Sequence, residues 1–197
     1  MISAVVLAAG RASRMGRTKQ LLPVGDRPML QHAIDAAVEA EVDEIVVVLG
    51  HDPERILRAI RLPANGRIAL NPAHAEGQST SLRAGLAATA PESRAAVILL
   101  ADQPGIPAPA VRAVMDEFLR TGARIVRASF GGAPGHPVLL ARETWNAVAG
   151  VEGDVGARDL IELHPEWVVD IEVPGTVPPD VDTPEDYERL LGGDVSG

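Results

Sequence analysis

The chain has 197 residues, enough for one well-packed domain, and because only 3% of them are aromatic we expect a core of Ala, Val, Leu and Ile. The formal net charge of -9 argues against a nucleic-acid partner, and no apolar run approaches the ~20 residues that span a bilayer, so no membrane partner is expected. The absence of cysteine excludes a disulfide framework, a thiol nucleophile and a zinc–thiolate site. With no basic leader before the first strand, a cytoplasmic protein is expected.

Apolar strands and helical patterns alternate along the sequence. In chain order we expect a strand at 2–8, a helix near 29–38, a strand at 44–50, a helix from Pro53 capped by Asp52, a strand at 67–70, a helix at 79–90, a strand at 95–101 and a helix at 107–121. Two strands follow at 124–130 and 137–140 around a glycine-rich turn at 131–135, then a helix at 157–163, a strand at 168–173 and a helix at 184–191. This alternation predicts an α/β domain over 1–191 with a mostly parallel sheet covered on both faces, and a flexible tail at 192–197.

The loop after the first strand is a candidate phosphate-binding site. Small residues at 8–10 let backbone N–H groups approach a phosphate closely. The glycine spacing matches neither the P-loop nor G-x-G-x-x-G, so a loop of another kind is predicted, with an ordinary basic loop as the alternative. Four positive charges in an acidic chain favour a local anionic ligand: Arg11, Arg14, Arg17 and Lys19.

Polar or small residues also follow the other expected strands. Gly50 and His51 follow the second strand, Asn71 the third and Asp102 the strand at 95–101. Ligands of open α/β sheets bind beyond the carboxyl ends of the strands, so these positions predict one shared site. His51 and His136 are expected to be solvated or structural and not metal ligands, because no helical His pair or His/Cys cluster is present.

Asp102 and Asp182 are candidate metal ligands. Asp102 precedes a proline-terminated turn, and its carboxylate is expected to point into the ligand crevice, where hard oxygen ligands suit Mg²⁺. A turn or capping role is the alternative. Thr183 and Asp186 have the spacing of a helix cap, which accounts for neither Asp180 nor Asp182.

The stretch 71–85 is a candidate nucleotide-binding loop. Gly77 provides a flexible turn, and Ser79, Thr80 and Ser81 supply hydroxyls where a helix is expected to begin. Exposed N–H groups and hydroxyls at a helix start can bind a base, ribose or phosphate. An ordinary Ser/Thr helix cap is the alternative for each residue taken singly.

Motifs along nearly the whole chain resemble those of the MobA-like nucleotidyltransferases, in particular molybdenum cofactor cytidylyltransferase. The first loop resembles L-A-A-G-x-S-x-R-M-G-x-x-K-x-L-L, and we interpret its two glycines, Ser13, the Arg-Met pair and Lys19 as the fixed residues of that signature. The other resemblances are N-x-x-x-x-x-G-x-x-x-S-L-x-x-G at 71–85, a hydrophobic residue followed by A-D-x-P at 100–104, G-x-P at 135–137, G-D-x-G-A-R at 153–158 and D-x-D-T-P-E-D at 180–186.

This resemblance implies a three-layer α/β/α, Rossmann-like fold and transfer of a nucleoside monophosphate from an NTP to a phosphorylated acceptor, with release of pyrophosphate. It implies catalytic roles for Arg14, Lys19 and Asp102, and Mg²⁺ as the cofactor, held by Asp102 and Asp182. The nucleotide-binding positions that it implies are Leu7, Ala8, Ala9, Gly10, Ser13, Arg14, Gly16, Lys19, Asn71, Gly77, Ser79 and Ser81. The acceptor-binding positions are Gln103, Gly135, His136, Pro137, Asp154 and Arg158.

The resemblance also bears on the substrates. An L-A-A-G loop accompanies CTP in this family and L-A-G-G accompanies GTP, so Ala9 favours CTP. Molybdopterin is the implied acceptor, with a molybdoenzyme or its chaperone as a further partner. Relatives also use sugar phosphates or other acceptors, or carry oxidoreductase names linked to nicotine breakdown.

Two alternative hypotheses do not involve nucleotidyl transfer. A non-catalytic cofactor-binding chaperone is disfavoured by intact Lys19 and Asp102. A dehydrogenase is disfavoured by the missing G-x-G-x-x-G motif.

Overall fold

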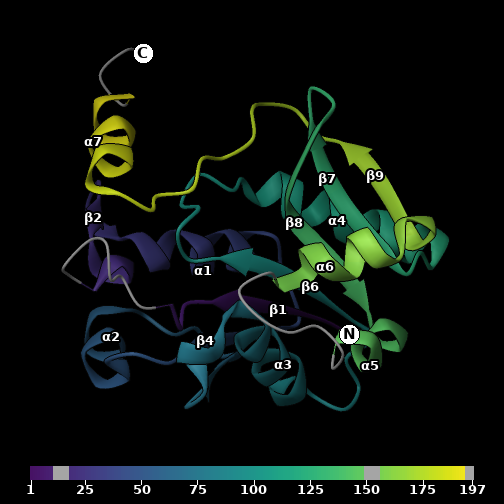
Figure 1. The fold of residues 1–197 in the computed structure, drawn as a ribbon, viewed down its shortest axis with the longest axis horizontal. Coiled ribbons are helices and arrows are strands. Elements are labelled where there is room, and N and C mark those ends of the chain that lie inside the picture. The colour runs from purple at the N-terminus through teal and green to yellow at the C-terminus, as the bar shows by residue number, and fades with distance from the viewer. Residues whose placement is uncertain (11–17, 149–155, 194–197) are drawn as a thin grey trace.

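A seven-stranded sheet with helices on both faces forms the body of the computed structural model, which describes residues 1–10, 18–148 and 156–193 (Figure 1). The strands of this sheet are β1 (Ile2–Leu7), β4 (Glu44–Leu49), β5 (Gly66–Leu70), β6 (Ala95–Leu100), β7 (Ile125–Phe130), β8 (Ala133–Ala141) and β9 (Val168–Glu172). The helices are α1 (Met29–Glu39), α2 (Pro53–Ala59), α3 (Gln78–Ala88), α4 (Ala108–Thr121), α5 (Trp145–Val148), α6 (Gly156–Leu163) and α7 (Pro184–Gly193). The described residues also form four single 3-10 turns: η1 (Lys19–Leu21), η2 (His74–Glu76), η3 (Arg142–Thr144) and η4 (Pro165–Trp167).

The strand order is β5-β4-β1-β6-β8-β7-β9, and β8 is antiparallel to both of its neighbours. The strands β5, β4, β1 and β6 are mutually parallel, with Leu7 opposite Val48 on one side and opposite Leu100 on the other. Their carboxyl ends therefore meet at one edge of the sheet. The expectation of a mostly parallel sheet in a three-layer α/β/α fold is confirmed.

Alternation along the buried strands divides the core into two faces. Ala4 and Val6 of β1 pack in the cluster that also holds residues of α1 and α4, together with Ile56 of α2. Val5 and Leu7 pack in the opposite cluster, with residues of α3, α5 and α6. In Figure 1, α3, α5 and α6 lie in front of the sheet, and α1 and α4 lie behind it. Because both faces are covered, β1 is apolar along nearly its whole length rather than alternating with polar residues.

Several local expectations need correction. The turn after β7 is shorter than the predicted 131–135, because β8 already begins at Ala133 and pairs with β7 through Phe130. A two-stranded hairpin of β2 (Pro23–Val24) and β3 (Arg27–Pro28) was not predicted. Asp52 precedes α2 as expected, but it adopts a left-handed conformation with φ 52° and its side chain makes no capping hydrogen bond.

The segment after β9 runs back across the molecule to α7, which lies beside β2 (Figure 1). Val181 of this segment is fully buried in a small cluster with Leu22 and Met29. The predicted cap of α7 is confirmed. The backbone N–H and the hydroxyl of Thr183 donate to Asp186 Oδ2 at 2.9 and 2.8 Å, and the Asp186 N–H donates to Thr183 Oγ1 at 3.2 Å. Among the helices of the described residues, none combines the length and apolarity needed to cross a membrane.

Candidate active site

A cavity of about 660 Å³ lies at the carboxyl ends of β1 and β6. Five parts of the chain line it: the end of β1, the segment around η1, the turn between β5 and α3 with the first turn of α3, the end of β6, and the segment before α7. The lining residues are Leu7, Ala8, Ala9, Gly10, Lys19, Gln20, His74, Ala75, Gly77, Gln78, Ser81, Leu100, Ala101, Asp102, Asp180 and Asp182. Most of the predicted nucleotide-binding and metal positions that the structure describes are therefore brought together on one cavity.

Gln20 holds the beginning of the candidate phosphate-binding loop. Its side chain is buried, with 4% exposed, and its Nε2 donates to the carbonyl oxygens of Ala8 and Gly10, each at 2.9 Å. The amide thereby provides a hydrogen-bond donor for two backbone carbonyl groups that lie just after the end of β1. Sequence analysis missed Gln20 because it occupies a variable position of the signature, between Lys19 and Leu21.

Lys19 joins the two candidate metal carboxylates. Its Nζ lies 2.9 Å from Asp102 Oδ2 and 2.8 Å from Asp182 Oδ1. Asp102 follows β6 and Asp182 lies 80 positions later, before α7, so only the tertiary fold places them on one cation. The arrangement is a compact cluster in which one positive charge faces two negative ones.

The charge of Lys19 is stabilised by this arrangement. Burial of the ammonium group lowers the pKa of Lys19, but the ion pairs with Asp102 and Asp182 outweigh burial, so the net pKa lies above its ordinary value. Lys19 is also the only lysine of the chain. The other 17 of its 18 Lys and Arg residues are arginines. An ammonium is a compact, flexible point charge, in contrast to the planar guanidinium of arginine.

A third carboxylate, Asp180, is anchored beside this cluster. Gln103 Nε2 donates to Asp180 Oδ1 at 2.8 Å, and the Val181 N–H donates to the carbonyl oxygen of Asp102 at 3.0 Å. Desolvation raises the pKa of Asp180 above its ordinary value, and the negative charges of Asp102 and Asp182 act in the same direction. These contacts fasten the segment before α7 to the end of β6.

The 71–85 stretch divides into lining residues and supporting residues. Gly77 and Ser81 line the cavity as predicted, whereas Asn71 and Ser79 do not. Asn71 is buried, and its Nδ2 donates to the hydroxyls of Thr80 and Ser81 at 2.8 and 2.9 Å. Asn71 thus orients Ser81 toward its place at the cavity and is a supporting residue.

In the turn between β5 and α3, three lining residues were not predicted: His74, Ala75 and Gln78. They come from η2 and the first residue of α3, which the sequence pattern treated as an undivided loop. Gly50 explains how closely this turn approaches the loop after β1. A Cβ at Gly50 would lie 2.5 Å from His74 Cβ and 2.8 Å from the Ala9 carbonyl oxygen, so a side chain there would push two cavity walls apart.

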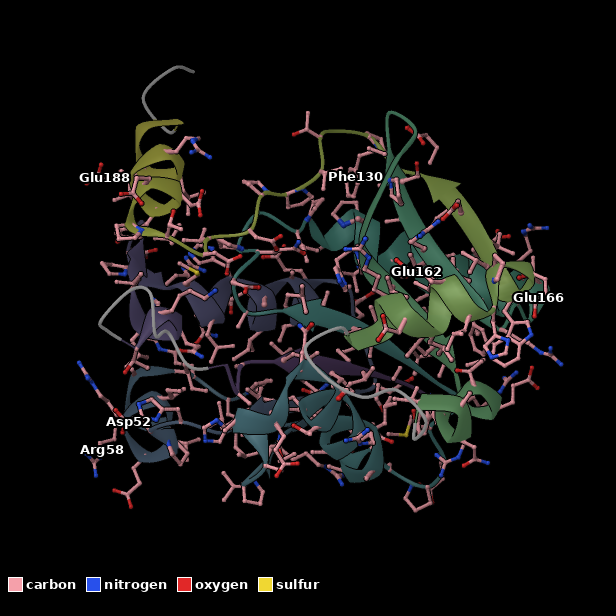
Figure 2. All side chains as sticks on the ribbon, viewed as in Figure 1. Asp52, Arg58, Phe130, Glu162, Glu166 and Glu188 are labelled. Carbon is pink, nitrogen blue, oxygen red and sulfur yellow. The ribbon has the colours of Figure 1, made fainter. Side chains whose placement is uncertain are left out.

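The predicted acceptor residues that the structure describes do not line this cavity. His136 is half-buried at the start of the inner part of β8, with its Nδ1 3.4 Å from the Ile98 carbonyl oxygen. Gly135 packs near Val177, Pro137 is buried in β8, and Gln103 is engaged with Asp180. Arg158 Nε donates to Glu162 Oε1 at 2.8 Å. Glu162 is labelled on α6 in Figure 2.

Four predicted positions lie outside the described residues: Ser13, Arg14, Gly16 and Asp154. The loop match also needs one correction. The Ser of the signature falls at position 12, where this chain has Ala12, and Ser13 follows one position later.

Asp102 and Asp182 fit a divalent cation. Both present an oxygen to a single positively charged atom, and carboxylate oxygens are the ligands that Mg²⁺ prefers. Within the described ranges, no group of three or more His, Asp or Glu side chains is placed to hold a metal ion. Two carboxylates completed by phosphates of a substrate is a usual arrangement for Mg²⁺.

Comparison with known proteins points to one family. Residues 4–168 match the model of the MobA-like NTP transferase domain. The chain is 33% identical to the nicotine blue oxidoreductase of Paenarthrobacter nicotinovorans, over 96% of each chain. It is 26% identical to the molybdenum cofactor cytidylyltransferase of Escherichia coli K12, over 94% of this chain and 93% of the relative.

A solved structure gives the same fold. The Rv0371c protein of Mycobacterium tuberculosis, crystallised in complex with manganese, superimposes with a TM-score of 0.82 at 31% identity, covering 97% of each chain. Asp180 and Asp182 lie beyond residue 168, where the family match ends, although they border the same cavity as Asp102.

Proposed function

Because the chain belongs to the MobA-like NTP transferase family, we propose that it is a divalent-metal-dependent nucleotidyltransferase that moves CMP from CTP to a phosphorylated acceptor. The observation that carries this proposal is the meeting of Lys19, Asp102 and Asp182 on a cavity at the carboxyl ends of β1 and β6. Such a cavity suits a triphosphate, because it combines loop backbone, a cation and two metal-binding carboxylates.

The reaction needs no nucleophile from the protein. An oxygen of the acceptor's phosphate attacks the α-phosphorus of the NTP, the bond from that phosphorus to the bridging oxygen breaks, and pyrophosphate leaves. Catalysis of this kind depends on positioning and on stabilising the charge that develops on the phosphates. A divalent ion bound by Asp102 and Asp182 would supply Lewis-acid polarisation of the phosphoryl oxygens.

The chain's own groups would hold the triphosphate. Ala9 and Gly10 present backbone at the cavity, in positions fixed by the side chain of Gln20. Lys19 would bind the phosphates and offset charge on the leaving pyrophosphate, with Arg14 as its partner in the loop. Gly77 and Ser81 would contact the nucleotide from the opposite wall.

Ala9 and the cytidylyltransferase relative support CTP as the donor and the pterin of the molybdenum cofactor as the acceptor. Mg²⁺ is the metal that we propose for the cell, and the manganese complex of a relative supports a divalent ion. On the acceptor side we propose Gln103, Gly135, His136, Pro137, Asp154 and Arg158.

The test is pyrophosphate release by the purified full chain with each of the four NTPs, Mg²⁺ and molybdopterin. We expect release that requires NTP, metal and acceptor together, and that is fastest with CTP. No release with any NTP, from protein shown to be folded, would contradict nucleotidyl transfer. Release with CTP and a sugar phosphate, but none with molybdopterin, would keep the reaction and reject the acceptor.

A second candidate is oxidoreductase activity on nicotine blue, favoured by the 33% identity to nicotine blue oxidoreductase along 96% of each chain. NAD(P)H oxidation in the presence of nicotine blue, without NTP, separates it from nucleotidyl transfer. Oxidation of NAD(P)H that persists in Asp102→Asn would favour the oxidoreductase.

A further inference from the structure

The position between Asp102 and Asp182 is held by Lys19. The two N–O distances, 2.9 and 2.8 Å, are those of direct charge-assisted hydrogen bonds. The Lys19 side chain is 15% exposed, whereas Asp182 is 53% exposed, so the ammonium lies deeper than one of the carboxylates that it bridges. Both carboxylates therefore meet a positive charge that the chain itself provides.

A divalent cation and this ammonium cannot share the two oxygens. Mg²⁺ binds carboxylate oxygens at about 2.0–2.1 Å, and a second positive charge beside it would be strongly repelled. A metal ion that binds Asp102 and Asp182 must therefore displace Lys19. Displacement breaks two ion pairs and leaves the ammonium in a partly buried position without those partners.

A triphosphate supplies the partner that the displaced ammonium needs. Lys19 borders the same cavity as Ala9, Gly10, Gly77 and Ser81, so phosphates bound there lie within the reach of a flexible lysine side chain. Metal and nucleotide would then strengthen each other's binding. The nucleotide gives the displaced ammonium a new partner, and the metal frees Lys19 to bind the phosphates; such coupling is reciprocal.

We propose that Lys19 acts as an exchangeable cation, which occupies the divalent-metal position in the free protein and moves to the triphosphate when NTP and metal bind together. The proposal rests on the proposed function. It gives Lys19 a role that arginine cannot fill equally well, since a planar guanidinium is not a point charge of similar size to a metal ion. The exchange also explains why the free protein would bind metal weakly when no nucleotide is present.

The first test is Mn²⁺ binding to the full-length free protein, measured by the electron paramagnetic resonance signal of unbound Mn²⁺. We expect Lys19→Met to bind Mn²⁺ about tenfold more tightly than the wild type without nucleotide, because two ion pairs no longer compete. CTP should strengthen Mn²⁺ binding in the wild type and much less in Lys19→Met. Equal or weaker Mn²⁺ binding by folded Lys19→Met would overturn the proposal.

Two variants control this comparison. Arg120→Met removes one positive charge from an exposed site on α4, where Arg120 pairs with Glu117, and should leave Mn²⁺ affinity as in the wild type. An equal gain in Arg120→Met would show that net charge alone explains the effect and would overturn the proposal. Lys19→Arg keeps a competing positive charge, so its Mn²⁺ affinity without nucleotide should remain within a few-fold of the wild type. A gain as large as that of Lys19→Met would overturn the proposal.

The single lysine also permits a direct observation. Lysine labelled with ¹³C at Cε alone gives one carbon resonance, that of Lys19, in an NMR spectrum of the whole protein. That resonance should shift when Mg²⁺ and CTP are added together, and much less with the same concentration of Mg²⁺ alone. A full shift with Mg²⁺ alone would overturn coupled exchange, whereas failure of pyrophosphate release would overturn only the proposed function.

Discussion

Asp102 lies at the point where β6 ends, and its carboxylate charge is what we expect the site to need. Asp102→Asn keeps the size of the side chain and the backbone carbonyl that accepts from Val181, but it loses the charge that pairs with Lys19 and would hold the metal. We expect metal-dependent transfer to fall by about a hundredfold or more. The measurement is the rate of pyrophosphate release at saturating Mg²⁺, alongside a circular dichroism melt.

Asp182→Asn is the matched comparison at the second carboxylate. Its side chain is 53% exposed, against 29% for Asp102, so its loss should impair transfer less. Full turnover in Asp102→Asn would place the metal site elsewhere, because the variant alters little besides one charge.

Ala9 tests the choice of nucleotide at the scale of one methyl group. Its side chain is 2% exposed and lines the cavity, so its Cβ would narrow the space for a base bound against this wall. We expect the wild type to prefer CTP over GTP, and Ala9→Gly to lose roughly tenfold of that preference, as fits the removal of one methyl group from a pocket. A competition assay with all four NTPs measures this ratio. A wild type that prefers GTP or ATP by about tenfold would refute the assignment of CTP.

A motif that fixes residue type and position was enough to mark three residues that lie together in the structure, although their roles stay predictions. Lys19, Asp102 and Asp182 are brought together as their chemistry suggested. Gln20 and Asn71 show the limit of this reasoning. Gln20 fills a variable position and Asn71 supports a hydroxyl instead of lining the cavity, and both roles depend on contacts made only in the folded chain.

At the scale of elements, α3 is held unusually close to the sheet at Gly85. A Cβ there would lie 2.4 Å from Val5 Cγ1 and 2.8 Å from Val48 Cγ2, and both valines are fully buried. Alanine gains about 1 kcal/mol of helix propensity over glycine, but overpacking a core costs about 1–3 kcal/mol. We therefore expect Gly85→Ala to lower the free energy of unfolding by about 1 kcal/mol, measured by urea denaturation.

Gly192→Ala on α7 is the matched control, because among the described residues no heavy atom outside the neighbouring backbone of α7 lies within 4 Å of the added Cβ. It should leave the urea midpoint unchanged or slightly raised. If Gly85→Ala were as stable as Gly192→Ala, the close packing of α3 on β1 and β4 would not constrain the fold.

Elements of strong apolar periodicity were predicted to within one or two residues at most of their ends, as for α1 and β6. The direction of strands was less accessible. β8 reads as one more apolar strand, and only its pairing with β6 and β7 shows that it runs antiparallel. The β2–β3 hairpin was missed because strands of two residues are too short to show an alternating apolar pattern.

At the scale of the whole molecule, the C-terminal segment completes a cavity built by the N-terminal half. Val181 anchors it in a cluster with Leu22 and Met29, and the contacts of Asp180 and Asp182 follow from that anchor. Sequence reasoning singled out Asp182 by its motif. It could not derive the contact with Lys19, because that contact spans 163 positions of the chain.

We expect His136 to link pH to the stability of the whole fold. Desolvation of its ring lowers the pKa of His136 below its ordinary value, despite opposing contributions from the Ile98 carbonyl and Asp102. As pH falls below about 6.5, the unfolded chain takes up the proton first, so the free energy of unfolding should decrease. His136→Gln should flatten this decrease between about pH 7 and 5, as measured by urea denaturation at each pH.

His51→Gln, at an exposed position, is the control for that series. It should leave the pH dependence of the wild type in place. A slope that persists unchanged in His136→Gln would show that another group carries the dependence.

The central claim is that the α-phosphoryl group of a nucleotide passes to an acceptor in this cavity. The most direct measurement follows two radiolabelled forms of CTP, with the label at the α- or the γ-phosphate, incubated with the protein, Mg²⁺ and molybdopterin. We expect the α-label on the acceptor and the γ-label in pyrophosphate, with both transfers lost in Asp102→Asn. An α-label that stays on free nucleotide while the γ-label appears as inorganic phosphate would show hydrolysis instead, and would contradict nucleotidyl transfer.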